Sequence, residues 1–242
     1  MKVKSFLIVI SLFIYGEIKL HAQANESNQS LASAKIRNVL QLYLDSLGHY
    51  NLLYNGAAYT SSYPGTEGHP FFNEPFFKQG TVKYNHIVYT DVPLLYELAS
   101  GDILTRNSNK ISIILSPEKV QSFIIGDASF LNFPNHEPVG NTPQKFYRVL
   151  YDGSIKVLVK IFKQSKRGLH GKDPYKFKQY ELYFILKDDT LFAITNKASL
   201  INAFDTHKVE LNKFLKNNKL RFKTDPVKTL KLSAEWYEQI SK

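Results

Sequence analysis

The stretch FYRVLYDGSIKVLVKIF, residues 146–162, places two β-rich runs on either side of the pair Asp152-Gly153. Both residues tolerate a positive φ angle, so the pair predicts a tight turn between two antiparallel strands. The second run puts Ile155, Val157, Val159 and Ile161 at alternate positions, with Lys156, Leu158 and Lys160 between them. Because successive side chains of a strand point to opposite faces, this pattern predicts a half-buried strand. The hairpin is therefore the predicted unit of the fold.

The same signature recurs from about residue 52 to 195, where short β-rich runs alternate with turn residues. Hairpin turns are predicted at Asn85-His86, at Ser100-Gly101 and around Asp188. Roughly eleven strands joined by short connections predict a largely antiparallel meander. The segment FPNHEPVGNTPQK, residues 133–145, is rich in Pro, Asn and Gly and predicts a long connection between two halves of one sheet system.

The segment YELYFIL, residues 180–186, carries apolar side chains on both alternating faces. A strand of this kind is covered on both sides. A curled sheet that holds a helix or loop against its concave side would produce such a mixture of strands, and so would two packed sheets. A half-barrel and a sandwich-like meander are therefore both compatible with the pattern.

Helical periodicity occurs at the two ends of the chain. The segment at 30–48 has Ser30 as a cap, an apolar stripe and Gly48 as a stop. Residues 197–241 predict two closing helices: first a helical hairpin or broken helix, then a helix that begins near Asp225. The predicted fold class is α+β and β-dominated, with a curled antiparallel sheet, one N-terminal helix and two C-terminal helices.

The first residues have the pattern of a secretory signal peptide. Two lysines precede an apolar run at 6–15, and Ala22 or Ala24 offers a small residue for cleavage. The run is about half of the ~20 residues that a membrane-spanning helix needs. We expect a signal peptide at 1–22, export, a single β-rich domain at 23–242, and no transmembrane segment after cleavage.

Cysteine is absent, which excludes disulfides, a lipid-anchored cysteine and thiol catalysis. The 31 Lys+Arg exceed the 21 Asp+Glu, and the formal charge is +10. An exported basic protein meets acidic lipid head groups, acidic glycans and cell-wall polymers more often than nucleic acid, and no nucleic-acid-binding module occurs. The densest basic run, residues 163–178, falls in an expected hairpin connection and is predicted to be a solvated loop.

The sequence predicts no catalytic residue, no metal site and no cofactor. The six histidines that follow the signal segment lack metal-ligand spacing, and neither a Gly-x-Ser-x-Gly motif nor a Gly-rich phosphate loop occurs. The carboxylate pair of a glycoside hydrolase is the enzymatic alternative, since its two acids can be far apart in sequence. The acids that lie among aromatic residues are Glu67, Glu74, Asp91 and Glu97.

The stretch HPFFNEPFF, residues 69–77, sets two Phe-Phe pairs behind Pro70 and Pro75. Each proline restrains its neighbour to extended geometry, so a rigid aromatic loop is expected. Burial as a core plug is favoured over an exposed binding patch, because a disulfide-free exported protein depends on a hydrophobic core. A plug of this kind can also shape a pocket. The candidate ligand-binding residues are Phe71, Phe72, Phe76, Phe77 and Tyr96.

Several segments, in order, carry a family resemblance: LLYNGAAY, GHPFF, GTVKYNHIVYTDVPLLYEL, VLYDGSIKVLVKIFK, NKASLINAF and KVELNKFLKNNKLRF. They resemble a group of uncharacterised exported proteins of Bacteroidota. The resemblance implies export and a β-rich architecture with closing helices, and it implies no catalytic residue. The helical C-terminus is unlike the β-sandwich tail of type IX secretion cargo, so the periplasm is the first expectation, with the cell surface and the extracellular medium as alternatives.

The leading hypothesis from the sequence is a non-enzymatic envelope protein that binds an apolar lipid-like ligand, a glycan or a partner envelope protein. The first alternative is a glycan-active hydrolase that uses a carboxylate pair. The second is a purely structural, partner-binding protein.

Overall fold

The computed structural model describes residues 53–241 except 62, 108, 134–144 and 168–173, together with Lys35, Ile36 and Val39. The chain separates into two compact units, Met1–Leu52 and Leu53–Lys242. In the first unit the three described residues are helical and exposed. The predicted signal peptide and the rest of the predicted N-terminal helix lie outside the described residues.

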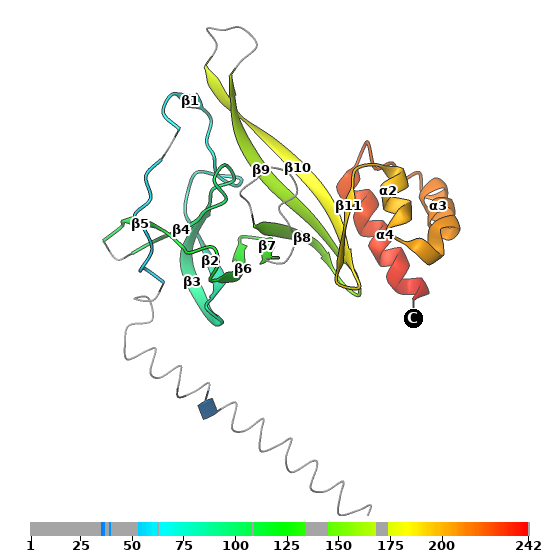
Figure 1. The fold of residues 1–242 in the computed structure, drawn as a ribbon, viewed down its shortest axis with the longest axis horizontal. Helices are drawn as coiled ribbons and strands as arrows, with labels where there is room; N and C mark the ends of the chain where they lie inside the picture. The colour runs from blue at the N-terminus through cyan, green and yellow to red at the C-terminus, as the bar shows by residue number, and fades with distance from the viewer. Residues whose placement is uncertain are drawn as a thin grey trace, which may run out of the picture. The chain divides into compact units, whose positions relative to one another are not determined.

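The second unit is built on one eleven-stranded sheet (Figure 1). The strands are β1 (Thr66–Glu67), β2 (Lys78–Tyr84), β3 (Ile87–Tyr96), β4 (Ile103–Arg106), β5 (Ser112–Ile114), β6 (Val120–Ile125), β7 (Ala128–Asn132), β8 (Phe146–Asp152), β9 (Lys156–Arg167), β10 (Tyr175–Lys187) and β11 (Thr190–Ile194). Their order is β1-β10-β9-β8-β7-β6-β2-β3-β4-β5, and β11 also pairs with β10. All pairings are antiparallel except β1 with β10. The predicted curled antiparallel sheet is confirmed, as one sheet rather than a sandwich.

Local turn chemistry explains the hairpins. Asn85 and His86 both have positive φ, 50° and 68°, in the β2–β3 turn, and Asp188 and Asp189 repeat this between β10 and β11. A two-residue turn with positive φ at both positions matches the twist of the flanking strands. Gly101, with φ of 86°, lies between β3 and β4. The predicted hairpins at these sites are confirmed.

The β8–β9 hairpin is also confirmed, but its turn differs from the predicted one. Asp152 pairs with Lys156, so three residues connect the strands, and neither residue of the expected pair is in the left-handed region. This turn contacts the C-terminal helix. Glu238 accepts a hydrogen bond of 2.9 Å from the backbone N–H of Ser154 and one from the hydroxyl of Tyr151. The long helix thus stabilises the turn from outside the hairpin.

Two expectations for β9 and β10 are wrong. The basic run at 163–178 is not mainly a loop, because β9 continues to Arg167 and β10 begins at Tyr175. The alternating face of β9 is not half-exposed either, since Leu158 and Lys160 are fully buried. Tyr147 and Phe184 from the neighbouring strands cover this face. Sequence alternation could not show these cross-strand neighbours.

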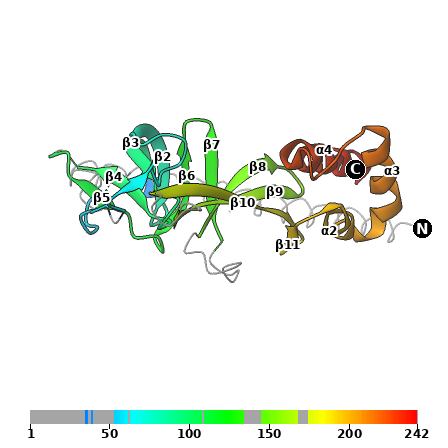
Figure 2. The same cartoon turned by 90° about the horizontal axis from the view of Figure 1, so that it is seen from above.

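The closing helices are α2 (Lys197–Asn202), α3 (Lys208–Asn217) and α4 (Pro226–Ile240), with a 3₁₀ turn at Asp205–His207. The first closing segment is therefore broken, one of the two forms predicted. Asn196 and Ser199 form a capping box at α2, and Asp225 caps α4 by accepting from the N–H of Lys228. Figure 2 shows the three helices gathered at one end of the sheet, beyond β11. No helix in the described part of the chain is long and apolar enough to cross a membrane.

Two large hydrophobic cores hold this unit together. Within the curl of the sheet, the rings of Tyr96, Phe123, Phe130 and Phe146 pack with centroids 4.6 to 6.1 Å apart. The second core lies between the helices and β8–β11 and includes Ile155, Val157, Ile185, Ile194, Leu200, Phe204, Leu211, Leu215, Leu230 and Ala234. Phe184 and Ile185 point to opposite faces of β10 and both are buried, which confirms the expectation of a strand covered on both sides there.

Candidate functional site

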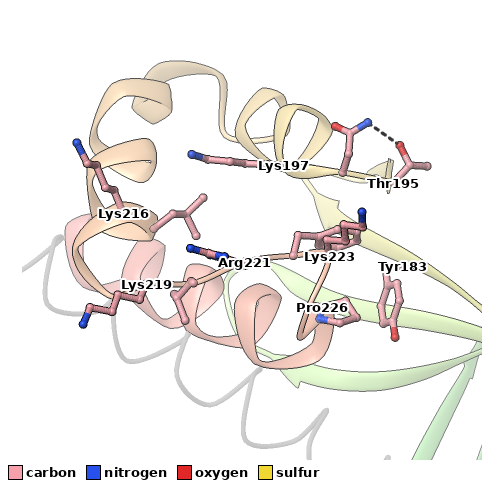
Figure 3. Close-up of a pocket in the computed structure, with 12 residues that line it drawn as sticks. Tyr183, Thr195, Lys197, Lys216, Lys219, Arg221, Lys223 and Pro226 are labelled. Carbon is pink, nitrogen blue, oxygen red and sulfur yellow. Dashed lines mark hydrogen bonds between the residues drawn. The ribbon is translucent and has the colours of Figure 1, made fainter.

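A pocket of about 1060 Å³ lies between the ends of β10 and β11 and the closing helices (Figure 3). It is formed by α2, by the last turn of α3 and by the connection from α3 to α4. The lining residues are Tyr183, Thr195, Asn196, Lys197, Leu215, Lys216, Lys219, Leu220, Arg221, Phe222, Lys223 and Pro226. We call this site the helix-end pocket.

The apolar part of the pocket is set by the way α3 ends. The N–H of Leu220 donates to the carbonyl of Leu215 at 2.9 Å, and the N–H of Lys219 donates to that of Lys216 at 3.1 Å. These two bonds form a Schellman motif, which brings Leu215 and Leu220 onto the same side of the helix end. Phe222 follows in the connection and contacts Tyr183 of β10 at 5.9 Å between ring centroids.

Lys219 occupies a strained position in this motif. Its φ is 53°, in the left-handed region where glycine is the residue without steric cost. A left-handed conformation costs other residues on the order of 1 kcal/mol. Lys219 is among the residues that line the pocket, and its ammonium group points outward in Figure 3. Strain of this kind is often found where a side chain has a function.

The polar rim of the pocket is cationic. Its charged side chains are Lys197, Lys216, Lys219, Arg221 and Lys223, and no carboxylate belongs to the lining. None of the five is among the ion pairs of the described residues. In Figure 3 the ammonium groups of Lys216 and Lys219 point outward, to the side opposite Tyr183 and Thr195. Cations gathered on partly apolar walls create a positive potential that attracts an anionic ligand.

Neighbouring acids are occupied by other contacts. Asp225 caps α4 through a 2.9 Å bond from the N–H of Lys228. Glu181 accepts a hydrogen bond from the hydroxyl of Tyr183. Burial, this bond and the charge of Glu181 raise the pKa of Tyr183 well above its usual range, so its phenol stays protonated. On the other wall, the Asn196 amide donates to the hydroxyl of Thr195 at 3.3 Å.

The aromatic residues predicted to bind ligand do not line the helix-end pocket. Phe72 is a core plug, 7% exposed, and its ring meets Phe130 edge-on at 5.2 Å. Tyr96 is 1% exposed and belongs to the aromatic core. Phe76 is 68% exposed, so the plug expectation is wrong for this residue.

The other two predicted rings are half-buried. Phe71 forms an isolated antiparallel β-bridge with Glu97, which follows β3. The ring centre of Phe77 lies 4.2 Å from the guanidinium carbon of Arg106. A second cavity of about 40 Å³ touches Phe72, Phe76 and Tyr96. That volume is far below the ~300 Å³ of the smaller ligand pockets. The plug prediction is thus confirmed only for part of the loop.

Two of the four acids considered for hydrolysis form ion pairs, one is buried and one is exposed. Glu67 pairs with Lys176 at 2.7 Å, and Glu74 pairs with Lys78 at 2.9 Å. Glu97 is buried close to Tyr59, and Asp91 is exposed on β3. Among the residues the structure describes, no group of three or more His, Asp or Glu could hold a metal ion.

Sequence reasoning did not find the helix-end pocket. The signal available was the run KNNKLRFK, residues 216–223, in which cations alternate with apolar residues between two predicted helices. Its partners, Tyr183 and Lys197, come from other elements, so only the folded arrangement brings them together.

Fold and pocket together define a β-dominated α+β protein whose curled sheet is closed at one end by a helical cap with a basic pocket. Comparison with family models, with curated proteins and with solved structures gives no match for this chain. The functional argument therefore depends on the residues of the site.

Proposed function

We propose that this is an exported, non-enzymatic binding protein, whose ligand is an amphiphile with an apolar part and an anionic head. One observation carries the proposal: the helix-end pocket combines an apolar floor with five cations and has no carboxylate in its lining. A set of like charges that forms no ion pair within the described part of the chain costs electrostatic energy in the free protein, and an anionic head group would relieve that cost.

The size and chemistry of the pocket support a lipid-like ligand. A volume of about 1060 Å³ is at the upper end of the range for small-molecule sites. Leu215, Leu220 and Phe222 offer apolar surface to an acyl chain. Arg221 presents a planar guanidinium, which can bind a phosphate or carboxylate with two parallel hydrogen bonds.

Export, a periplasmic location and membership of the resembling Bacteroidota group belong to the same proposal. The signal-peptide pattern at 1–22 supports export, and the β-rich architecture with closing helices is the one that the resemblance implies. A binding protein of the envelope would meet anionic amphiphiles in that compartment. The glycan hydrolase has less support, because Glu67 and Glu74 each form an ion pair with a different lysine and Glu97 is buried.

The test is calorimetric titration of the mature protein with lysophosphatidylglycerol below its micelle concentration. Lysophosphatidylcholine, with a zwitterionic head, is the matched ligand. We expect binding of the anionic lipid, with affinity reduced at least about tenfold in Arg221→Gln/Lys223→Gln, because two charge-assisted contacts are lost.

The control variant is Lys119→Gln/Lys231→Gln, which removes the same charge at exposed positions away from the pocket. It should bind like the wild type. Equal affinity for both lipids, or equal loss in both double variants, would contradict the anionic-head proposal. No binding of either lipid would favour a purely structural role.

A further inference from the structure

The β9–β10 hairpin carries a second basic surface toward its open end. In the register of the two strands, Lys166 lies directly opposite Lys176, and Gln164 lies opposite Lys178. Opposite residues share a face of the ribbon, and so do residues two apart along a strand. Lys166, Lys176 and Lys178 therefore project from one face. We call these three residues the lysine ladder.

The ladder is electrostatically unfavourable in the free protein. The Cβ atoms of opposite residues are about 5 Å apart, and Lys178 follows Lys176 at about 7 Å along its strand. Like charges at opposite positions destabilise a sheet. A bound chain with closely spaced negative charges would remove this repulsion.

Tyr180 fixes the position of two of these charges. The ammonium groups of Lys166 and Lys178 lie 5.0 and 5.6 Å from the centre of its ring. Phe162, on the opposite strand, stacks on the same ring at 5.3 Å with an interplanar angle of 19°. Stacking on Phe162 thus orients the ring of Tyr180, and the cation–π contacts with this ring orient the two ammonium groups. Cations that are already oriented lose less entropy when they bind an anion.

A carboxylate already contacts the end of the ladder. The carboxylate of Glu67 lies 2.7 Å from Nζ of Lys176, and both side chains are more than half exposed. Lys166 and Lys178 have no ion pair among the described residues.

The opposite face of the hairpin is covered by the segment at 63–71. Tyr63 packs edge-on against Phe177 at 5.2 Å, and Nζ of Lys163 donates to the carbonyls of His69 and Phe71. Thr66 and Ser165 add a hydroxyl contact at 3.3 Å. The two faces of the hairpin therefore differ: the segment at 63–71 packs on one of them, and the other presents the three lysines.

We infer that the lysine ladder binds a linear acidic polysaccharide through its carboxylates. The surface lacks the features that two other polyanionic partners use. The ring of Tyr180 is already engaged by Phe162 and two ammonium groups, so it is no platform for a nucleic-acid base. The large exposed apolar side chains of the described residues do not include any on this face, as a membrane-inserting surface would require.

The experiment is a titration of the mature protein with oligogalacturonate, a linear uronic-acid polymer. Neutral dextran, phosphatidylglycerol vesicles and single-stranded DNA are the comparison ligands. We expect oligogalacturonate to bind with an affinity that falls as salt rises. The variant Lys166→Gln/Lys178→Gln should lose at least about tenfold in affinity, whereas Lys119→Gln/Lys231→Gln should change it less than about twofold.

Thermal unfolding of both variants should stay close to that of the wild type, because the four lysines are exposed, and any change in Lys166→Gln/Lys178→Gln should be toward higher Tm, because like-charge repulsion is relieved. Equal loss of affinity in the two variants would show that only net charge matters and would overturn the inference. Tighter binding to vesicles or DNA than to the uronic acid would overturn it as well. The lysophosphatidylglycerol titration reports on the pocket independently, since the ladder contributes none of the pocket lining.

Discussion

At the scale of single residues, Glu97 shows how burial couples this fold to pH. Its side chain is 1% exposed, and Tyr59 lies close by. Burial raises the pKa of the Glu97 carboxyl above its ordinary value of 4.5, and Asp102 adds to the rise, while the Tyr59 hydroxyl opposes it. The folded protein therefore binds this proton more tightly than the unfolded chain does.

The raised pKa of Glu97 determines the direction in which stability changes with pH. As pH rises from the unfolded pKa through the folded pKa, the contribution of Glu97 to stability falls, because ionisation costs more in the folded state. Glu97→Gln removes that dependence, because an amide of nearly the same shape does not ionise. We expect little difference in Tm from the wild type below about pH 4, and an advantage for the variant that grows with pH to a plateau.

Thermal unfolding monitored by circular dichroism from pH 4 to pH 8 measures the effect. Each kcal/mol should appear as about 2–4 °C in Tm for a chain of this size. Glu181→Gln is not a suitable control, because Glu181 accepts from Tyr183, whereas Glu118→Gln changes an exposed carboxylate. A difference in Tm that is constant across this range would contradict the assignment.

At the scale of elements, one residue at the end of α3 lowers the stability of the fold and is expected to strengthen ligand binding. Lys219 holds a left-handed conformation in the Schellman motif, which glycine would adopt without strain. Lys219→Gly should raise the free energy of unfolding by about 0.5–1 kcal/mol and weaken binding of lysophosphatidylglycerol, because a rim cation is lost.

Lys219→Gln is the matched variant, since it removes the charge but keeps a side chain in the strained conformation. It should weaken binding without the gain in stability. Urea unfolding followed by the fluorescence of Trp236, the single tryptophan, reports on this region because its ring stacks on Phe214 of α3. If Lys219→Gly lowered stability, the proposed strain would be wrong.

At the scale of the whole molecule, local signals were enough to predict the class of fold. The turn at Asn85-His86 and the capping residue Asp225 act through their own backbone neighbourhoods, so the sequence shows them directly. Contacts between strands and between helix and sheet could not be predicted from the sequence, because they join residues that are far apart in the chain. The turn after Asp152 depends on Glu238, which lies 84 residues beyond Ser154 in the chain.

The same limit applies to the sites. Aromatic pairs such as Phe71-Phe72 stand out in a sequence, yet Phe72 serves the core. The helix-end pocket depends on residues from β10, α2 and the α3–α4 connection, and the lysine ladder depends on strand register. Both sites arise from juxtaposition, which the spacing of residues along the chain does not reveal.

The central claim is that the helix-end pocket holds an anionic amphiphile, and native mass spectrometry of the protein purified from its own envelope tests it most directly. We predict a co-purified acidic lipid or fatty acid at one copy per chain, retained by Lys119→Gln/Lys231→Gln and absent from Arg221→Gln/Lys223→Gln. Protein without a bound molecule in every preparation would contradict the account. So would a bound molecule that remains in Arg221→Gln/Lys223→Gln.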